Sequence, residues 1–153
     1  MPQLTPEQVS EFLATPVIAR LATVKPDGGP YIVPVWQHWD GEAMYVIPRG
    51  RSRFVEHLRS EPRVAVSCAD DESDMELGTG HRRVLIEGRA EIIEGPVLMT
   101  GLMLDIAREM AERYGGEAGL TYLDGTMRKP RYLLRIVSDT MTTWEGSWHP
   151  RYG

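Results

Sequence analysis

The densest group of side chains able to do chemistry is the run Pro-Arg-Gly-Arg-Ser-Arg at residues 48–53. Arg49, Arg51 and Arg53 place three guanidinium groups within five positions, and guanidinium groups donate paired hydrogen bonds to phosphate oxygens. Ser52 adds a hydroxyl and is the expected cap of a following helix, whose unpaired first amides favour an anion. The spacing is not that of a P-loop. Two interpretations stay open: a phosphate site, or arginines that are solvated or paired with acidic residues.

A second group is aromatic, because the chain has four Trp and six Tyr but only two Phe. Indole and phenol groups suit positions that are apolar on one side and polar on the other, such as a flat ligand's pocket or a subunit interface. Core packing suffices for Trp36 and Tyr45, but it does not explain Trp144 and Trp148 beyond the last expected strand. Arginines and aromatics together favour a phosphorylated, planar molecule, a cofactor that itself carries the reactivity.

Other catalytic templates are missing from the sequence. The four His residues have no i, i+3 or i, i+4 spacing, so we expect no metal site. There is no Gly-x-Ser-x-Gly turn, and Cys68 lies among small apolar residues without a basic neighbour, which predicts an inert buried thiol. Tyr31 and His38 are candidates for moving a proton, although surface or core packing explains each equally well.

The composition predicts one domain over residues 1–153, with 42% hydrophobic and 25% charged residues. One Cys excludes an internal disulfide. The net charge of −5 argues against a general electrostatic grip on nucleic acid. No stretch approaches the roughly 18 apolar residues that cross a membrane, and the N-terminus lacks the features of a signal peptide. We therefore expect a cytoplasmic protein that binds neither nucleic acid nor a membrane.

Turn residues and hydrophobic periodicity predict the elements that position these groups. Thr5 and Gln8 form a capping box at the start of a first helix, and a second helix follows Ser52. Pro34 should impose an edge position or an irregularity on its strand, and Gly88 should mark a bulge or a close backbone approach. Strands are expected at 17–24, 31–39, 43–47, 63–69, 83–93 and 131–143, and a third helix is expected from 97 to 111, ending near 114–116.

This order of elements predicts a small antiparallel barrel with helices packed outside it. The methionines of the third helix are expected to fill the core rather than to form a binding surface. The acidic run at 70–76 is expected to be a solvated loop without a metal ion.

Several short segments share their order and spacing with a known family. They are ARLATV (19–24), PDG (26–28), PVW (34–36), PRGRS (48–52), PRV (62–64) and GRAE (88–91). From about residue 5 to residue 144, the chain resembles the flavin-binding split-barrel family of pyridoxamine 5′-phosphate oxidase-like proteins. The resemblance implies a mainly β fold, a six-stranded antiparallel split barrel of Greek-key type, and a homodimer with FMN at the subunit interface. It also implies an oxidoreductase that transfers hydride to or from a small organic substrate.

Carried over by position, the resemblance places the isoalloxazine ring against the second expected strand and the phosphate at the arginine-rich turn. It places Trp144 at the cofactor of the other subunit, and it assigns no catalytic residue. Phe54 departs from the family's frequent Arg-Lys pair, so neighbouring arginines would replace one phosphate contact. The implied cofactor-binding residues are Val33, Pro34, Val35, Trp36, Ile47, Pro48, Arg49, Arg51, Ser52, Arg53 and Trp144.

Alternatives stay open within the family. Pyridoxamine phosphate oxidases carry a longer arginine-rich C-terminal motif, which His149-Pro150-Arg151 echoes only faintly. Short members similar to this chain often use an 8-hydroxy-5-deazaflavin coenzyme in place of FMN. Other relatives bind haem or flavin for storage or sensing and are not enzymes. The sequence separates neither the cofactors nor the substrates.

Overall fold

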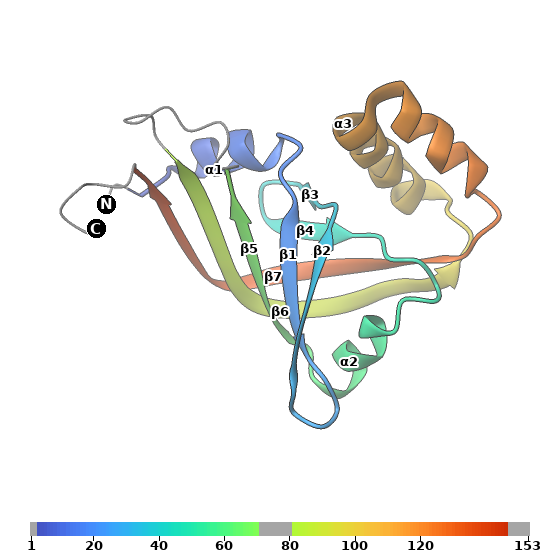
Figure 1. Cartoon of the computed structure of the whole chain (residues 1–153), viewed down its shortest axis with the longest axis horizontal. Helices are drawn as coiled ribbons and strands as arrows, with labels where there is room; N and C mark the ends of the chain where they lie inside the picture. The colour runs from blue at the N-terminus through green and yellow to red at the C-terminus, as the bar shows by residue number, and fades with distance from the viewer. Residues whose placement is uncertain (1–2, 71–80, 147–153) are drawn as a thin grey trace.

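The computed structural model describes residues 3–70 and 81–146. Antiparallel strands form one sheet, and helices lie outside it (Figure 1). The strands are β1 (Ala19–Val24), β2 (Pro30–Val35), β3 (His38–Trp39), β4 (Ala43–Val46), β5 (Arg63–Ala69), β6 (Arg82–Val97) and β7 (Arg131–Glu145). The helices are α1 (Pro6–Leu13), α2 (Phe54–Ser60) and α3 (Gly101–Gly125). The expected class, mainly β with flanking helices, is confirmed.

The sheet curls because its two edge strands are neighbours in the chain. The strand order is β2-β1-β5-β6-β7-β4-β3, so β2 and β3 lie at opposite edges although only Trp36 and Gln37 separate them. The two edges therefore approach each other at this link. No ladder between β2 and β3 closes the barrel among the described residues.

The single strand expected at 31–39 is two strands, which gives the sheet of the described residues seven strands rather than six. Gln37 is fully buried at the break. Its Nε2 donates to the carbonyl of Leu13 at 2.8 Å, and its backbone N–H donates to the hydroxyl of Tyr114 at 3.3 Å. These bonds replace the ladder bonds that a continuous strand would make. Pro34 lies on the edge strand β2, where its missing N–H is tolerated.

Two apolar clusters form the core. The larger lies between the sheet and helices α1 and α2, and the capping box of Thr5 and Gln8 fixes the start of α1 as predicted. The smaller lies under α3 and contains Met99, Met103 and Met110, so these methionines fill the core as predicted, but Met99 and Met110 also line a cavity, which the prediction did not include. None of the helices formed by the described residues is long and apolar enough to span a membrane.

Helix α3 differs from its prediction at both ends. It begins at Gly101 because residue 97 is still in β6, and it continues past the expected end as a second helical segment (Figure 1). The kink is at Gly116, whose φ of 56° lies in the left-handed region that glycine adopts without strain. A Cβ at Gly119 would overlap the carbonyl of Ala111, so the two segments approach closely. The irregular connection expected after residue 116 is therefore wrong.

The long β6–β7 ladder contains the predicted irregularity at Gly88. The register shifts between Glu87 and Gly88, and a Cβ at Gly88 would overlap the carbonyl oxygen of Val137. Only glycine permits this close approach of the two strands.

The substitution Gly88→Ala is therefore expected to destabilise the fold by about 1–3 kcal/mol, as overpacking does. Chemical denaturation measures this loss. Gly115→Ala is the matched control, because nothing lies within 4 Å of a Cβ there, and it should leave stability unchanged or slightly raised. Equal stabilities of the two variants would contradict the close approach.

Candidate functional site

Backbone pairing holds the arginine-rich turn against the start of β7. The N–H of Gly50 donates to the carbonyl of Pro130 at 2.8 Å, and the N–H of Tyr132 donates to the carbonyl of Pro48 at 3.0 Å. An isolated β-bridge pairs Arg49 with Arg131. The pairing therefore brings together two arginines that are 82 positions apart in the chain.

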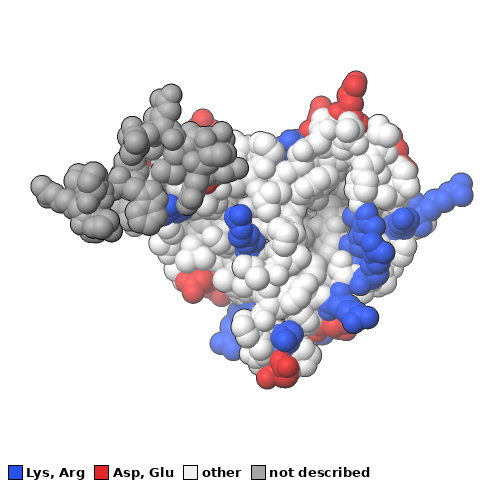
Figure 2. Space-filling view, viewed as in Figure 1, with Lys and Arg blue, Asp and Glu red and all other residues white. Residues whose placement is uncertain are grey.

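A cavity of about 370 Å³ lies between this pairing and α3. Four of the residues that the resemblance implied as cofactor-binding, Val35, Trp36, Ile47 and Arg49, meet in its wall. Figure 2 shows Lys and Arg side chains gathered beside a hollow of uncharged surface beneath α3. The remaining lining residues are Val46, Met99, Ala107, Met110, Tyr122, Leu123 and Arg131.

Aromatic rings form one wall of the cavity. Trp36 stacks on Tyr114 with ring centroids 5.1 Å apart and an interplanar angle of 3°, and it meets Tyr122 edge-on at 6.5 Å. Tyr114 is anchored in turn, because its hydroxyl donates to the carbonyl of Val17 at 2.5 Å. Burial raises the pKa of Tyr114, so this phenol stays a neutral donor. Trp36 is therefore held by α3 while 36% of it remains exposed.

The hydroxyl of Tyr122 is in contact with a cation of the cavity wall. Arg49 Nη2 donates a hydrogen bond to its oxygen, and the guanidinium carbon lies 5.6 Å from the ring centroid. This bond, with a further contribution from Arg131, holds the pKa of Tyr122 below its usual value despite partial burial. Cations stabilise the phenolate, and they also make the phenol a better hydrogen-bond donor.

A smaller cavity of about 230 Å³ adjoins the first and is lined by Arg49, Gly50, Arg51, Lys129 and Pro130. Arg49 thus lines both cavities. Carbon atoms form nearly all of its wall, so the charged ends of Arg49, Arg51 and Lys129 lie around this cavity rather than inside it. Together they make this corner of the molecule cationic, which favours an anion nearby.

The arginine-rich turn has no carboxylate partner in the part of the chain that the structure describes. The ion pairs found there do not include Arg49, Arg51 or Arg53. Asp70, the first residue of the acidic run, pairs with Arg82 instead, with a distance of 2.9 Å between Nε and Oδ2. The rest of that run, residues 71–76, lies outside the described residues.

Ser52 does not cap α2. The N-cap residue is Arg53, and it makes no side-chain capping bond. The N–H of Ser52 donates to the carbonyl of Arg49 at 2.9 Å, so a tight turn precedes the helix. The predicted helix cap at Ser52 is wrong, because this turn places the start of the helix one residue later.

The other predicted residues lie apart from the main cavity. Trp144 lines a separate cavity of about 890 Å³, where the guanidinium carbon of Arg83 lies 5.7 Å from its ring. Val33 packs on the larger core cluster, and Pro34 is exposed. Within one chain, the structure therefore does not bring Trp144 to Trp36.

The candidates for proton transfer also lie elsewhere. Tyr31 packs on Phe54 and His57, and neither it nor His38 lines the main cavity. Burial lowers the pKa of His38, whose Nδ1 is 3.4 Å from Glu109 Oε2. Burial raises the pKa of the Cys68 thiol to about 12, which confirms an inert side chain. Within the described ranges, no group of three His, Cys, Asp or Glu residues is placed to hold a metal ion.

Tyr122 and Arg131 were not among the site residues predicted from the sequence. Both reach the cavity through contacts between distant segments, and neither belongs to a local motif. The sequence Lys-Pro-Arg at residues 129–131 gives a weak indication, because Arg131 begins an expected strand. No neighbouring residue in the sequence indicates that Arg131 lies beside Arg49.

The comparisons with known proteins agree with this architecture. The family model described as pyridoxamine 5′-phosphate oxidase matches residues 5–145. A conserved hypothetical protein of Mycobacterium tuberculosis, Rv2991, is 26% identical with a TM-score of 0.68, over 93% of this chain and 85% of that chain. No curated protein matches the sequence.

The names of two further similar structures refer to two different cofactors, haem and F420. HutZ, the haem storage protein of Vibrio cholerae, is 22% identical with a TM-score of 0.68, over 95% of this chain and 96% of that one. An F420 reductase is 21% identical with a TM-score of 0.62, over 86% of this chain and 94% of that one. At these identities the likeness establishes the fold.

The contact between Arg49 and Tyr122 predicts a measurable change in proton affinity. In Arg49→Gln the strongest cause of the lowered pKa of Tyr122 is lost, so this pKa rises toward its ordinary value. Ultraviolet titration of tyrosinate checks this, with Tyr122→Phe identifying the signal by subtraction. Arg128→Gln is the control, because Arg128 is exposed and does not line the cavity. An unchanged titration in Arg49→Gln would show that the contact is absent in solution.

Proposed function

The chain belongs to the pyridoxamine 5′-phosphate oxidase family, and from this premise we propose that it is an oxidoreductase that binds a flavin-type cofactor. FMN is the proposed cofactor, and a small organic molecule is the proposed substrate. The observation that carries the proposal is the junction at Arg49, where a turn rich in cationic side chains adjoins an apolar, aromatic-walled cavity. A cofactor in which a phosphate is attached to a flat ring system has an anionic end for the cationic region and an aromatic end for the apolar cavity.

The residues present fit such a group. Arg51 and Arg53 are exposed cations without a carboxylate partner in the described part of the chain. Arg49 and Lys129 add positive charge to the adjoining cavity. We assign the phosphate to the turn formed by Ile47, Pro48, Arg49, Arg51, Ser52 and Arg53, and the ring to the surface of Val33, Pro34, Val35 and Trp36.

The cofactor would supply the hydride chemistry, and the chain's own residues would bind, orient and shield the reactants. Trp36 offers a rigid aromatic face, since Tyr114 holds its ring in parallel contact. Met99 and Met110 in the cavity wall exclude water from the space beside that face. No described side chain has to transfer a proton for these roles, so we propose no acid or base.

A homodimer belongs to this proposal, because Trp144 and Trp36 line separate cavities within one chain. A second subunit would place its own Trp144 beside the ring. Exposed apolar side chains that such an interface would cover are Ile32, Ile93, Val97, Leu98 and Leu102. Light scattering tests the dimer, since a particle with the 17.3 kDa mass of one chain would contradict it.

The first test is whether the purified protein binds and uses a cofactor. We expect FMN to bind, with a shifted visible spectrum, and to turn over with a reduced nicotinamide and an electron acceptor. The similarity to an F420 reductase makes the deazaflavin coenzyme the second arm of the experiment. Turnover with the deazaflavin alone would replace FMN in the proposal. Binding of haem or flavin without any turnover would reject the enzyme and favour storage or sensing.

The second test addresses the phosphate assignment. In Arg51→Ala/Arg53→Ala, loss of two charge-assisted hydrogen bonds of about 1.5–3 kcal/mol each should weaken FMN binding by at least about 100-fold. Fluorescence titration measures the affinity, and Arg128→Ala, which removes an exposed charge nearby, should leave it unchanged. Because the replaced side chains are exposed, the fold should persist. Equal affinities of the double variant and the control would reject the assignment.

A further inference from the structure

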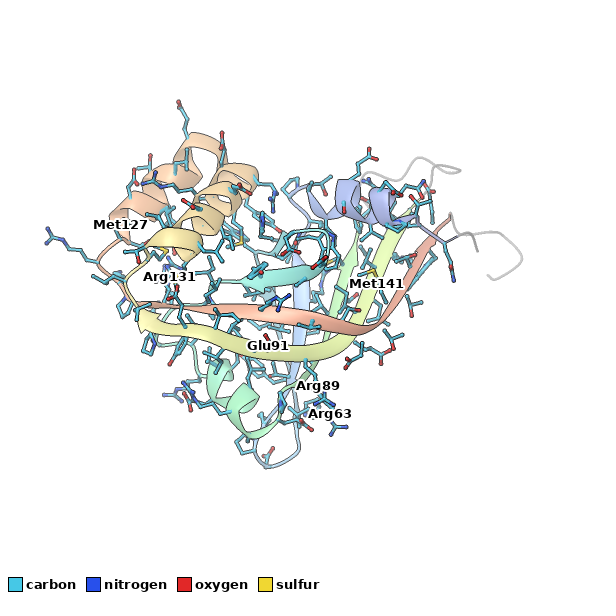
Figure 3. The ribbon with its side chains drawn as sticks, turned by 180° about the vertical axis from the view of Figure 1, so that it is seen from behind. Arg63, Arg89, Glu91, Met127, Arg131 and Met141 are labelled. Carbon is cyan, nitrogen blue, oxygen red and sulfur yellow. The ribbon has the colours of Figure 1, made fainter. Side chains whose placement is uncertain are left out.

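A buried cation that has no counter-ion among the described residues borders the main cavity. Arg131 is only 8% exposed, and it lies at the start of β7 beside α3 (Figure 3). Its Nη2 donates to Thr126 Oγ1 at 3.0 Å, and its Nη1 reaches the carbonyl of Ile47 at 3.5 Å. Its Nε is buried and has no hydrogen-bond partner. These neutral contacts leave the charge of the guanidinium uncompensated.

This situation differs from that of other arginines in the described chain. Five of them pair with carboxylates: Arg59, Arg63, Arg82, Arg89 and Arg135. All five are more exposed than Arg131. Burial of an unpaired charge is costly, so a buried arginine left unpaired beside a cavity indicates that an anion enters the cavity and supplies the missing charge.

Two further groups of the cavity wall suit the same anion. Arg49 donates a hydrogen bond to the hydroxyl of Tyr122, and both Arg49 and Arg131 lower the pKa of that hydroxyl. The three polar groups therefore lie close together in the cavity wall. Tyr122 accepts from Arg49 and keeps its own proton to donate. The cavity lining contains no carboxylate. Two cations and one phenol therefore form a donor set that an oxyanion would satisfy.

The rest of the wall is apolar. Met99, Ala107, Met110 and Leu123 are among its lining residues. A fully solvated inorganic ion would leave these side chains unused, whereas a molecule with an apolar body would bury them. The ligand therefore has an anionic end and an apolar body.

We propose that this cavity binds the substrate through a carboxylate or phosphate end, held by Arg131, Arg49 and Tyr122. The substrate's apolar body lies along α3 and points its reacting end toward Val35 and Trp36, the proposed ring surface. This inference rests on the proposed function, because it names the substrate class of the same site. Arg49 lies at the junction of the two proposed sites, and the cofactor's phosphate is assigned to the rest of the arginine-rich turn, at Arg51 and Arg53.

Isothermal titration with three probes tests the inference: benzoate, phenyl phosphate and the uncharged benzamide. The protein is used both as purified and after saturation with FMN. We expect one or both anions to bind at least about tenfold more tightly than benzamide in both states, as charge-assisted hydrogen bonds imply. The preferred anion then identifies the head group of the substrate class.

Variants assign the preference to the donors. Arg131→Gln should abolish the preference for the anion, and Tyr122→Phe should reduce it several-fold without changing the affinity for benzamide. Arg128→Gln removes an exposed arginine outside the cavity and should keep the full preference. Thermal unfolding verifies that Arg131→Gln is folded. If it is not, Tyr122→Phe decides, because its side chain is 44% exposed and its loss should spare the core.

Three results would overturn the inference. The first is equal binding of the anions and benzamide, and the second is a preference that survives in both Tyr122→Phe and a folded Arg131→Gln. The third is displacement of the anions by FMN, which would assign these donors to the cofactor's phosphate. A failure of FMN to bind is a different outcome: it rejects the proposed cofactor, while titration of the purified protein still decides whether the anion subsite exists.

Discussion

The short backbone pairing between the arginine-rich turn and the start of β7 determines the geometry of the site. Gly50 and Tyr132 make its two hydrogen bonds, and these place Arg49 beside Arg131. Without this pairing, the turn would be an exposed loop after β4, and Tyr122 would lose its strongest partner. The cavity exists because two segments distant in sequence meet under α3, which contributes Ala107, Met110, Tyr122 and Leu123 to its wall.

The prediction from sequence succeeded where the signal is local. The capping box at Thr5, the turn residues, the edge position of Pro34 and the irregularity at Gly88 each follow from the chemistry of one residue and its neighbours. It failed where distant contacts decide. Gln37 breaks a strand by bonding to Leu13 and Tyr114, and no property of residues 31–39 alone reveals those partners.

The residues of the site also divide into those with a local signal in the sequence and those that depend on distant contacts. Arg49 was predicted because three arginines stand close together in the sequence, and Val35, Trp36 and Ile47 were implied by the resemblance; the structure brings these four into one wall. Arg131 and Tyr122 could not be predicted, since their importance comes from burial and from contact with Arg49. A buried cation is recognisable only after the fold shows what surrounds it.

The charge distribution connects these observations. The chain carries a net charge of −5, so its long-range field does not attract anions, and any anion has to be held by short-range donors within a low-dielectric cavity. Burial strengthens such interactions, because water no longer screens the guanidinium groups. Arg49 lines both cavities, so the proposed cofactor site and the proposed substrate site share this one cation.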